Sequence, residues 1–340
     1  MDKLPPRNGG FAAISATARL TLMALFCPIL ASAMHIIGGE MTYRYISTNP
    51  TTGAKTFEFT LLVYRDCAGG GADLDQSAPI GIYRGKASAA SLIDNFSVPI
   101  GLKEPVVPFI PPCTDPSATN GTCAERGVYT FTRELPVSAT ESYFVVYQRC
   151  CRTNSITNIN NPNSHGATYM VELTPAAQAG NNSSPVFKNY PPTFICANFN
   201  IAFDHSATDV DGDSLVYVFC NSLDGGGNAG GGGGTGCNSP TPNPPCGPPF
   251  AVVPFSGGYT FNVPMGGDPL IKIDSTTGFL DGVPGVLGKF VVGICVLEYR
   301  NGVLIGSILR DFQFNVVDCT PTVMAIVSAD SLVDDEHYVV

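Results

Sequence analysis

The sequence predicts an all-β fold, with two antiparallel β-sandwiches in tandem that are stapled by disulfides. Gly and Pro are abundant, at 37 and 28 of 340 residues, which favours turns and short strands over helices. Apolar and polar residues alternate with a period of two along many short segments. Hydrophobic residues make up 44% of the chain, enough for the cores of about two domains.

Residues 1–33 have the features of a secretory signal peptide. Basic residues precede the apolar run Leu20–Leu30, and small residues follow it at Ala31–Ala33, where cleavage is expected. The apolar run is shorter than the roughly 20 residues that span a membrane. We therefore expect the chain to be secreted or held at the outer cell surface, with no transmembrane segment after signal cleavage.

The charge balance limits the class of partner. Only 14% of the residues are charged and the net charge is −10. A protein that binds nucleic acid needs Lys and Arg to neutralise phosphates, so nucleic acid is not an expected partner. Other surface proteins, surface glycans and calcium are compatible with an acidic chain.

The first β-sandwich is expected over residues 34–178. Its predicted strands alternate between apolar and polar residues, and they are Met41–Ile46, Lys55–Cys67, Gly127–Leu135, Ser142–Cys150 and Ala167–Pro175. Residues 179–185, with the sequence AGNNSSP, are polar and aperiodic, so they are expected to be the linker to the next domain.

The second β-sandwich is expected over residues 186–319. Its predicted strands are Thr193–Phe203, Ser214–Cys220, Gly258–Pro264, Pro269–Asp274, Lys289–Arg300 and Val303–Cys319. The last two flank Asn301 and Gly302, a pair that favours a type I′ hairpin turn. Residues 320–340 resemble the start of a truncated following β-domain or a tail.

The cysteines are typical of an oxidising compartment. The chain has 12, of which Cys27 belongs to the signal peptide, so an odd number remains. Cys67 is expected to bridge to one of the adjacent pair Cys150 and Cys151, because both strands end in Tyr-x-x-Cys. Cys113 with Cys123, and Cys237 with Cys246, are expected to close loops. A redox-active bridge between the adjacent pair is the less common alternative.

The stretch Ala207–Tyr217, ATDVDGDSLVY, is the candidate site. Asp209, Asp211 and Asp213 alternate, so their side chains would share one face of an extended segment. Calcium is the hard cation that suits such carboxylates in an extracellular protein, although the EF-hand spacing is not met. The alternative is an Asp-Gly turn that leads into the strand Ser214–Cys220, with the side chains bonding local amides. Both interpretations stay open, and calcium is the one cofactor to test.

Catalytic motifs are missing from the sequence, which contains no HExxH helix, GxSxG elbow or paired CxxC ligand sets. The sequence therefore favours a protein that is not an enzyme. A carbohydrate-binding or carbohydrate-active β-sandwich is the alternative, with a sugar platform among Tyr143, Tyr147, Tyr190 and Tyr259.

The chain also resembles known bacterial surface proteins. ATDVDGDSLVY and the pattern Thr277, Gly278, Leu280, Gly282, Pro284 are similar to cadherin-like and Ig-like repeats. The strings HIIGGEMTYRY, LLVYRDC, YQRCCR, PPTFICAN and EYRNG…RDFQFNVVDC resemble the N-terminal module of large secreted Bacteroidota surface proteins. That group includes gliding-motility-associated proteins exported by the type IX system. The resemblance implies adhesive or structural roles and supplies no catalytic residues.

Overall fold

The computed structural model describes residues 36–68, 73–107, 123–192, 194–227 and 237–319, together with the backbone of 331–334 and 337–339. The expected signal peptide lies outside these residues, as does most of the expected segment 320–340.

The predicted all-β fold is confirmed, and no helix in the described part of the chain is long and apolar enough to cross a membrane. The helical elements are η3 (Pro162–Ser164) and α2 (Pro175–Ala179). The strands are β1 (Ile36–Thr48), β2 (Lys55–Asp66), β3 (Ser77–Gly85), β4 (Ser91–Pro99), β5 (Leu102–Pro105), β6 (Ala124–Leu135), β7 (Ser142–Arg149), β8 (Ala167–Leu173), β9 (Val186–Phe187), β10 (Ile195–Cys196), β11 (Phe203–Asp204), β12 (Ala207–Thr208), β13 (Ser214–Cys220), β14 (Lys272–Ile273), β15 (Phe279–Asp281), β16 (Gly288–Arg300), β17 (Val303–Val317), β18 (Ser331–Asp334) and β19 (His337–Val339).

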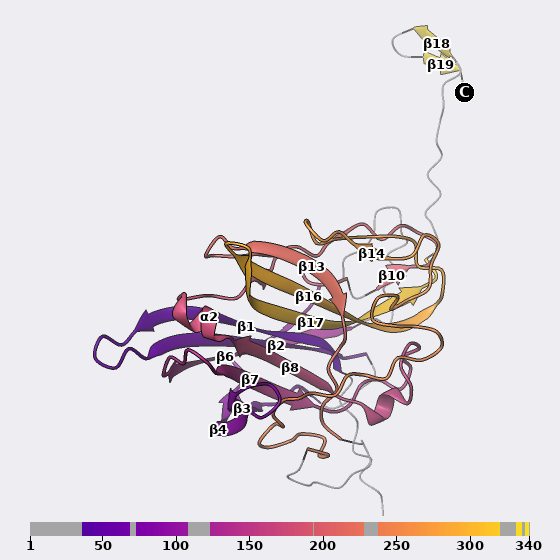
Figure 1. Cartoon of the computed structure of the whole chain (residues 1–340). Helices are drawn as coiled ribbons and strands as arrows, with labels where there is room; N and C mark the ends of the chain where they lie inside the picture. The colour runs from indigo at the N-terminus through magenta and orange to yellow at the C-terminus, as the bar shows by residue number, and fades with distance from the viewer. Residues whose placement is uncertain are drawn as a thin grey trace, which may run out of the picture. The chain divides into compact units, whose positions relative to one another are not determined.

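Twelve strands form one sheet, which curls into a half-barrel (Figure 1). Its main path runs β4-β3-β7-β8-β17-β1-β2-β6-β5. Outside this path, β10 and β16 each pair with β17, and β13 pairs with β16. The pairings are antiparallel except for the short one between β10 and β17. β17 is the junction of the sheet, because it pairs with β1, β8, β10 and β16.

Two tandem sandwiches are not confirmed. Strands from the expected first domain, 34–178, and from the expected second domain, 186–319, are hydrogen-bonded in the same sheet. The expected linker, 179–185, differs from its prediction as well, since Asn182, Ser183 and Ser184 are buried. Polar side chains are buried here because they complete the hydrogen bonding of β1. The Ser184 Oγ accepts from the Tyr43 amide at 2.9 Å, and the Ser183 Oγ accepts from the Tyr45 amide at 3.2 Å.

Several predicted strands are shorter than expected or do not form. Thr193–Phe203 contains only β10 and the first residue of β11, and Gly258–Pro264 is a turn with one isolated bridge instead of a named strand. β3 and β4 were not predicted, because their sequences, SAPIGIYRG and SLIDNFSVP, contain proline and little alternation. The hairpin at Asn301 and Gly302 is confirmed, with φ values of 52° and 78°.

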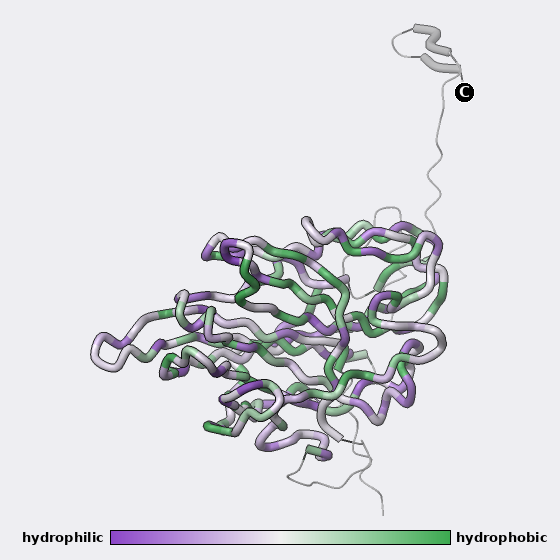
Figure 2. Tube along the Cα trace, in the orientation of Figure 1, coloured by the Kyte–Doolittle hydropathy of each residue, from purple (hydrophilic) through white to green (hydrophobic). Residues whose placement is uncertain are grey.

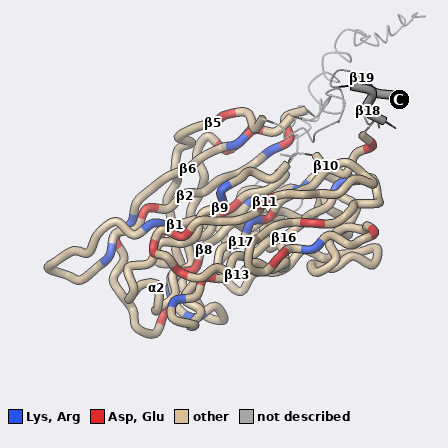
Figure 3. Tube along the Cα trace, turned by 90° about the horizontal axis from the view of Figure 1, so that it is seen from above, with Lys and Arg blue, Asp and Glu red and all other residues tan. Residues whose placement is uncertain are grey.

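The core is rich in aromatic side chains. Hydrophobic and hydrophilic residues are interspersed along the strands (Figure 2). Five tyrosines are among the largest fully buried side chains: Tyr64, Tyr129, Tyr143, Tyr147 and Tyr169. Two of these rings, Tyr147 and Tyr169, stack across β7 and β8 with centroids 6.4 Å apart. Lys and Arg positions are scattered among Asp and Glu positions over the described elements (Figure 3).

Two ion pairs are buried on opposite faces of β17. Arg310 donates to both carboxylate oxygens of Glu40 on β1, with a distance of 2.8 Å between Nη2 and Oε1. The next residue, Asp311, accepts from Arg152, with 3.1 Å between Oδ1 and Nη1. All four side chains are at most 3% exposed. Consecutive strand residues point to opposite faces, so both faces of the sheet are covered at this point.

All ten described cysteines are paired, in five disulfides. The predicted Cys237–Cys246 bridge is confirmed. The other two expected pairings are wrong, because Cys67 bonds to Cys123. The adjacent Cys150 and Cys151 bond to each other, which was the less common alternative. The reason for the Cys67–Cys123 bond is strand register. Asp66 at the end of β2 pairs with Ala124 at the start of β6, so Cys67, which follows β2, lies beside Cys123, which precedes β6. Cys113 lies outside the described residues.

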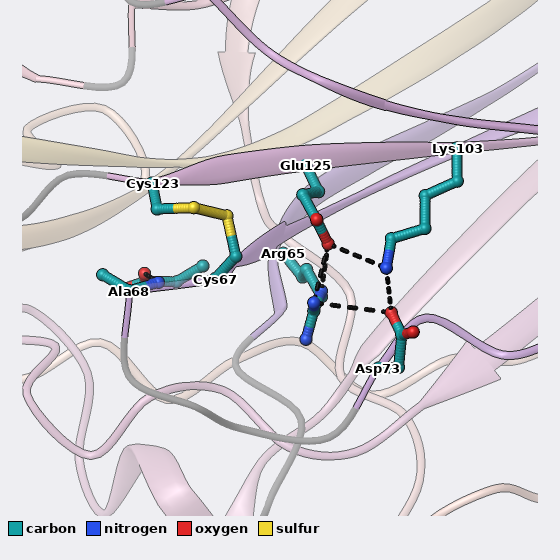
Figure 4. Close-up of a disulfide and its surroundings, with 8 residues drawn as sticks. Arg65, Cys67, Ala68, Asp73, Lys103, Cys123 and Glu125 are labelled. Atoms are coloured by element: carbon teal, nitrogen blue, oxygen red, sulfur yellow. Dashed lines mark hydrogen bonds and ion pairs between the residues drawn. A yellow bond between two sulfur atoms is a disulfide. The ribbon is translucent and has the colours of Figure 1, made fainter.

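The Cys67–Cys123 bridge lies beside a ring of four charges (Figure 4). Arg65 contacts Glu125 at 2.7 Å and Asp73 at 3.4 Å, and Lys103 contacts the same two carboxylates at 3.2 and 2.7 Å. Each pair is partly solvated and is worth at most about 1 kcal/mol. The disulfide therefore stabilises this end of the β2–β6 pair more than any one of the ion pairs does.

Removing one partner of a buried pair should be costly. We expect Arg152→Met to lower the free energy of unfolding by about 3–5 kcal/mol, because Asp311 would keep its charge without a partner. The double variant Arg152→Met/Asp311→Leu should recover much of this loss. Chemical denaturation measures both, and equal losses in the single and double variants would contradict the argument.

Candidate functional site

The acidic cluster predicted from the sequence forms a turn before β13. The Asp209 Oδ1 accepts from the amides of Asp211 at 2.9 Å and Asp213 at 3.0 Å. Gly212 adopts a φ of +82°, a conformation that side chains other than glycine rarely take. The local hydrogen bonds of the turn interpretation are therefore present.

The other two aspartates point to partners elsewhere in the chain. The Asp211 Oδ2 accepts from the Ser183 amide at 2.6 Å, and it lies 3.7 Å from Arg300. Arg300, at the end of β16, donates to both oxygens of Asp213, at 2.8 Å from Nε and 2.5 Å from Nη2. Such two-point contacts are the strong form of a carboxylate–guanidinium pair. They fasten the turn to the β16–β17 hairpin.

Glu298 on β16 joins this cluster, and the sequence analysis missed it. Its carboxylate, with those of Asp209 and Asp213, offers ligand atoms that lie within 4.8 Å of one another. Glu298 is fully buried, and its Oε1 accepts from the Asn182 amide nitrogen at 2.8 Å. Burial raises the pKa of Glu298 to about 9; the Asn182 contact opposes this rise and a hydrogen bond with Asp209 adds to it. Glu298 is therefore protonated at neutral pH.

The cluster fits calcium poorly. Calcium takes 6–8 oxygen ligands. Within the described residues, the Asp209 Oδ2 and the Glu298 Oε2 have no hydrogen-bond partner apart from the contact that a protonated Glu298 makes with Asp209. Both Asp213 oxygens are already bound by Arg300, whose positive charge opposes a second cation. These contacts favour the turn interpretation over the metal site at Asp209, Asp211 and Asp213.

A second candidate is an open groove of about 1150 Å³ over β11, β14 and β15, which we call the Phe279 groove (β14 is labelled in Figure 1 and β11 in Figure 3). β15 pairs with β11 and β14 in register, with Asp204 opposite Phe279 and Lys272 opposite Asp281. These four side chains therefore share one face of the small sheet, and all four residues are exposed. Leu280, between Phe279 and Asp281 on β15, faces the core and is 1% exposed.

The Asp-x-x-Thr-Gly motif shapes one wall of this groove. The Asp274 Oδ1 accepts from the amides of Thr276 and Thr277 and from the Thr277 hydroxyl, at 2.7–2.9 Å. Gly278 then turns the chain with a φ of +73°, and a side chain there would meet the Tyr217 ring at 2.9 Å. The turn that this motif forms thus places Phe279 among the residues that line the groove.

His205 lies beneath the groove between two of its lining residues, Asp204 and Ser206. Its ring is buried, neither nitrogen bonds to any residue that the structure describes, and the ring packs edge-on against Phe187 and Phe203. Arg310 lies on Phe187, 3.8 Å from the ring centroid. Burial first, and then the charge of Arg310, hold the pKa of His205 well below its usual value.

The predicted sugar platform is not formed as expected. Tyr143 and Tyr147 are fully buried, because β7 is covered on both of its faces. Tyr190 is 47% exposed, but it packs against Tyr64 and Arg126. Tyr259 is partly buried against Phe290. The groove aromatic that is exposed, Phe279 at 39%, was not among the predicted residues.

No family model, curated protein or solved structure matches the chain. The assignment of function therefore starts from the geometry of the two sites.

Calcium should not stabilise the fold. We expect the melting temperature to be the same in millimolar calcium and in EDTA, because Arg300 and the backbone amides already compensate the carboxylates. Asp211→Asn should give the same result. A rise in melting temperature with calcium that is lost in Asp211→Asn would establish the metal site instead.

Glu298→Gln provides a matched control for the same cluster. The amide keeps the shape of a protonated carboxyl, can accept from Asn182 and can donate to Asp209, so we expect a melting temperature close to that of the wild type. Glu298→Leu removes both contacts, so the buried Asn182 Nδ2 keeps only the Tyr43 hydroxyl as an acceptor and Asp209 loses its donor, which costs about 1–3 kcal/mol. Equal melting temperatures for these two variants would contradict the hydrogen-bonded arrangement.

Acid should destabilise the wild type relative to His205→Phe. The unfolded chain protonates His205 near pH 6.5, whereas the folded chain does so only at lower pH. The contribution of His205 to the free energy of unfolding is therefore present above pH 6.5 and is lost as the pH falls below it. The gap in free energy of unfolding should widen by up to about 1.4 kcal/mol per pH unit from pH 6.5 to 5. Comparing the two proteins isolates this residue from the carboxyl groups. A constant gap would show that the folded protein accepts the proton.

Proposed function

We propose that the chain is a non-enzymatic adhesion or structural module of a secreted or cell-surface protein, and that it binds other surface components through the Phe279 groove. The groove carries the proposal. It places an exposed aromatic ring among acidic, basic and hydroxyl side chains on a small sheet whose other face is anchored in the core. Such a mixture of one apolar surface and several polar groups is typical of recognition sites.

The disulfides support the exported setting. Five bridges are unusual in a reducing cytosol and common in secreted proteins. Cys220–Cys295 joins β13 to β16, and Cys196–Cys319 joins β10 to the end of β17. The first of these bonds restricts β13, which lines the groove through Tyr217, and so supports the shape of that wall.

The proposed context is the N-terminal module of a large secreted Bacteroidota surface protein of the gliding-motility-associated, type IX-exported kind. This part of the proposal depends on the sequence strings alone. The cadherin-like and Ig-like character is proposed for the repeat motifs, whose aspartates here build turns at Asp209 and Asp274.

Beads that carry the oxidised protein should be retained under flow on a lawn of cells from the source organism. We expect Lys272→Glu to abolish retention, because it reverses a charge on the groove floor. Lys86→Glu, a charge reversal at an exposed turn outside the groove, should have no effect. Equal retention of the Lys272→Glu and wild-type beads, or none for the wild type, would contradict the proposal.

A further inference from the structure

On the basis of the proposed function, we infer that the Phe279 groove binds a saccharide chain. The floor of the groove provides what a sugar ring requires, an apolar surface beside polar groups. Phe279 lies directly opposite Asp204 in the β11–β15 pair, and Asp281 lies on its other side along β15. The ring is thus flanked by carboxylates on two sides.

The aromatic ring supplies the apolar contact. Phe279 is 39% exposed even though its neighbours Gly278 and Leu280 are buried. The face of an aromatic ring carries partial negative charge, which attracts the slightly positive C–H groups on the flat side of a sugar. The Gly278 turn and the buried Leu280 fix the side of the small sheet from which the Phe279 side chain projects.

The polar groups supply hydrogen bonds in both directions. Asn200 donates to the Asp281 Oδ1 at 2.9 Å and so orients this carboxylate, whose second oxygen bonds to none of the described residues. Lys272, in register with Asp281, makes no ion pair within the described part of the chain. A sugar hydroxyl can donate to the carboxylate and accept from the ammonium at the same time.

The charges favour a neutral or weakly charged ligand over a polyanion. Lys188 and Lys272 line the groove together with Asp204, Asp274 and Asp281. Three carboxylates therefore stand against two ammonium groups, and this small negative excess repels a polyanion. At about 1150 Å³ and open to solvent, the groove exceeds the roughly 300–1,000 Å³ of sites that enclose a small molecule. A chain of several sugar units suits this space.

Affinity electrophoresis of the full chain in gels that contain dextran, laminarin, xylan or mannan tests this inference. We expect at least one polysaccharide to retard the wild-type protein. Phe279→Ala should weaken that binding about tenfold, through the loss of stacking and buried apolar area. Phe279→Tyr keeps the ring and should retain binding. Leu92→Ala, which shortens a similarly exposed side chain on β4, should bind like the wild type.

Two results would overturn the inference: no retardation by any of the four polysaccharides, or equal retardation of Phe279→Ala and the wild type. Melting temperatures of the variants separate lost binding from lost folding. If polysaccharide binding fails while bead retention still depends on Lys272, the proposed function stands with a different class of partner. Release of new reducing ends from a bound polysaccharide would contradict the non-enzymatic part of that proposal.

Discussion

The buried charges of β17 are the constraint on which the rest of the sheet depends. Arg310 and Asp311 are adjacent, so a shift of one residue in strand register would place each charge on the wrong face. A charge buried without its partner costs several kcal/mol, a large fraction of the stability of a typical domain. The two pairs therefore fix β17 against β1 on one face and against the Arg152 segment on the other. Every neighbour of β17 takes its position from that register.

Local features of the fold were predictable, whereas its long-range pairing was not. The Asn301-Gly302 turn and the strand Ser214–Cys220 follow from residue types alone, because turn geometry and alternation are properties of short segments. The joining of both sequence halves into one sheet depends on contacts such as Glu40 with Arg310. Nothing in the pattern of either segment identifies its partner. The strings HIIGGEMTYRY, YQRCCR and RDFQFNVVDC, however, contain all four residues of the two buried pairs, which gives these unusual strings a physical reason.

The candidate sites show the same division. The three aspartates were visible as an alternating motif, but Glu298 was not, because alternation along β16 marks it only as one more strand residue. The tyrosine platform failed because β7, which carries Tyr143 and Tyr147, is covered on both faces, and the pattern of the strand alone does not reveal its second cover. Phe279 lies within the Thr277-Gly278-x-Leu280 pattern, which resembles the repeats of surface proteins. Its exposure could have been inferred from the glycine before it and the buried leucine after it.

The position of β17 also determines when the fold can form. This strand is among the last described segments to leave the ribosome or an export channel, yet it pairs with β1, among the first, as well as with β8, β10 and β16. Until it emerges, the edges of β1 and β8 lack their partner, and Cys196 lacks the thiol of Cys319. Contacts so distant along the chain form slowly, because a long loop must close first. The sheet can thus close only once β17 is available, and the Cys196–Cys319 disulfide can form only then.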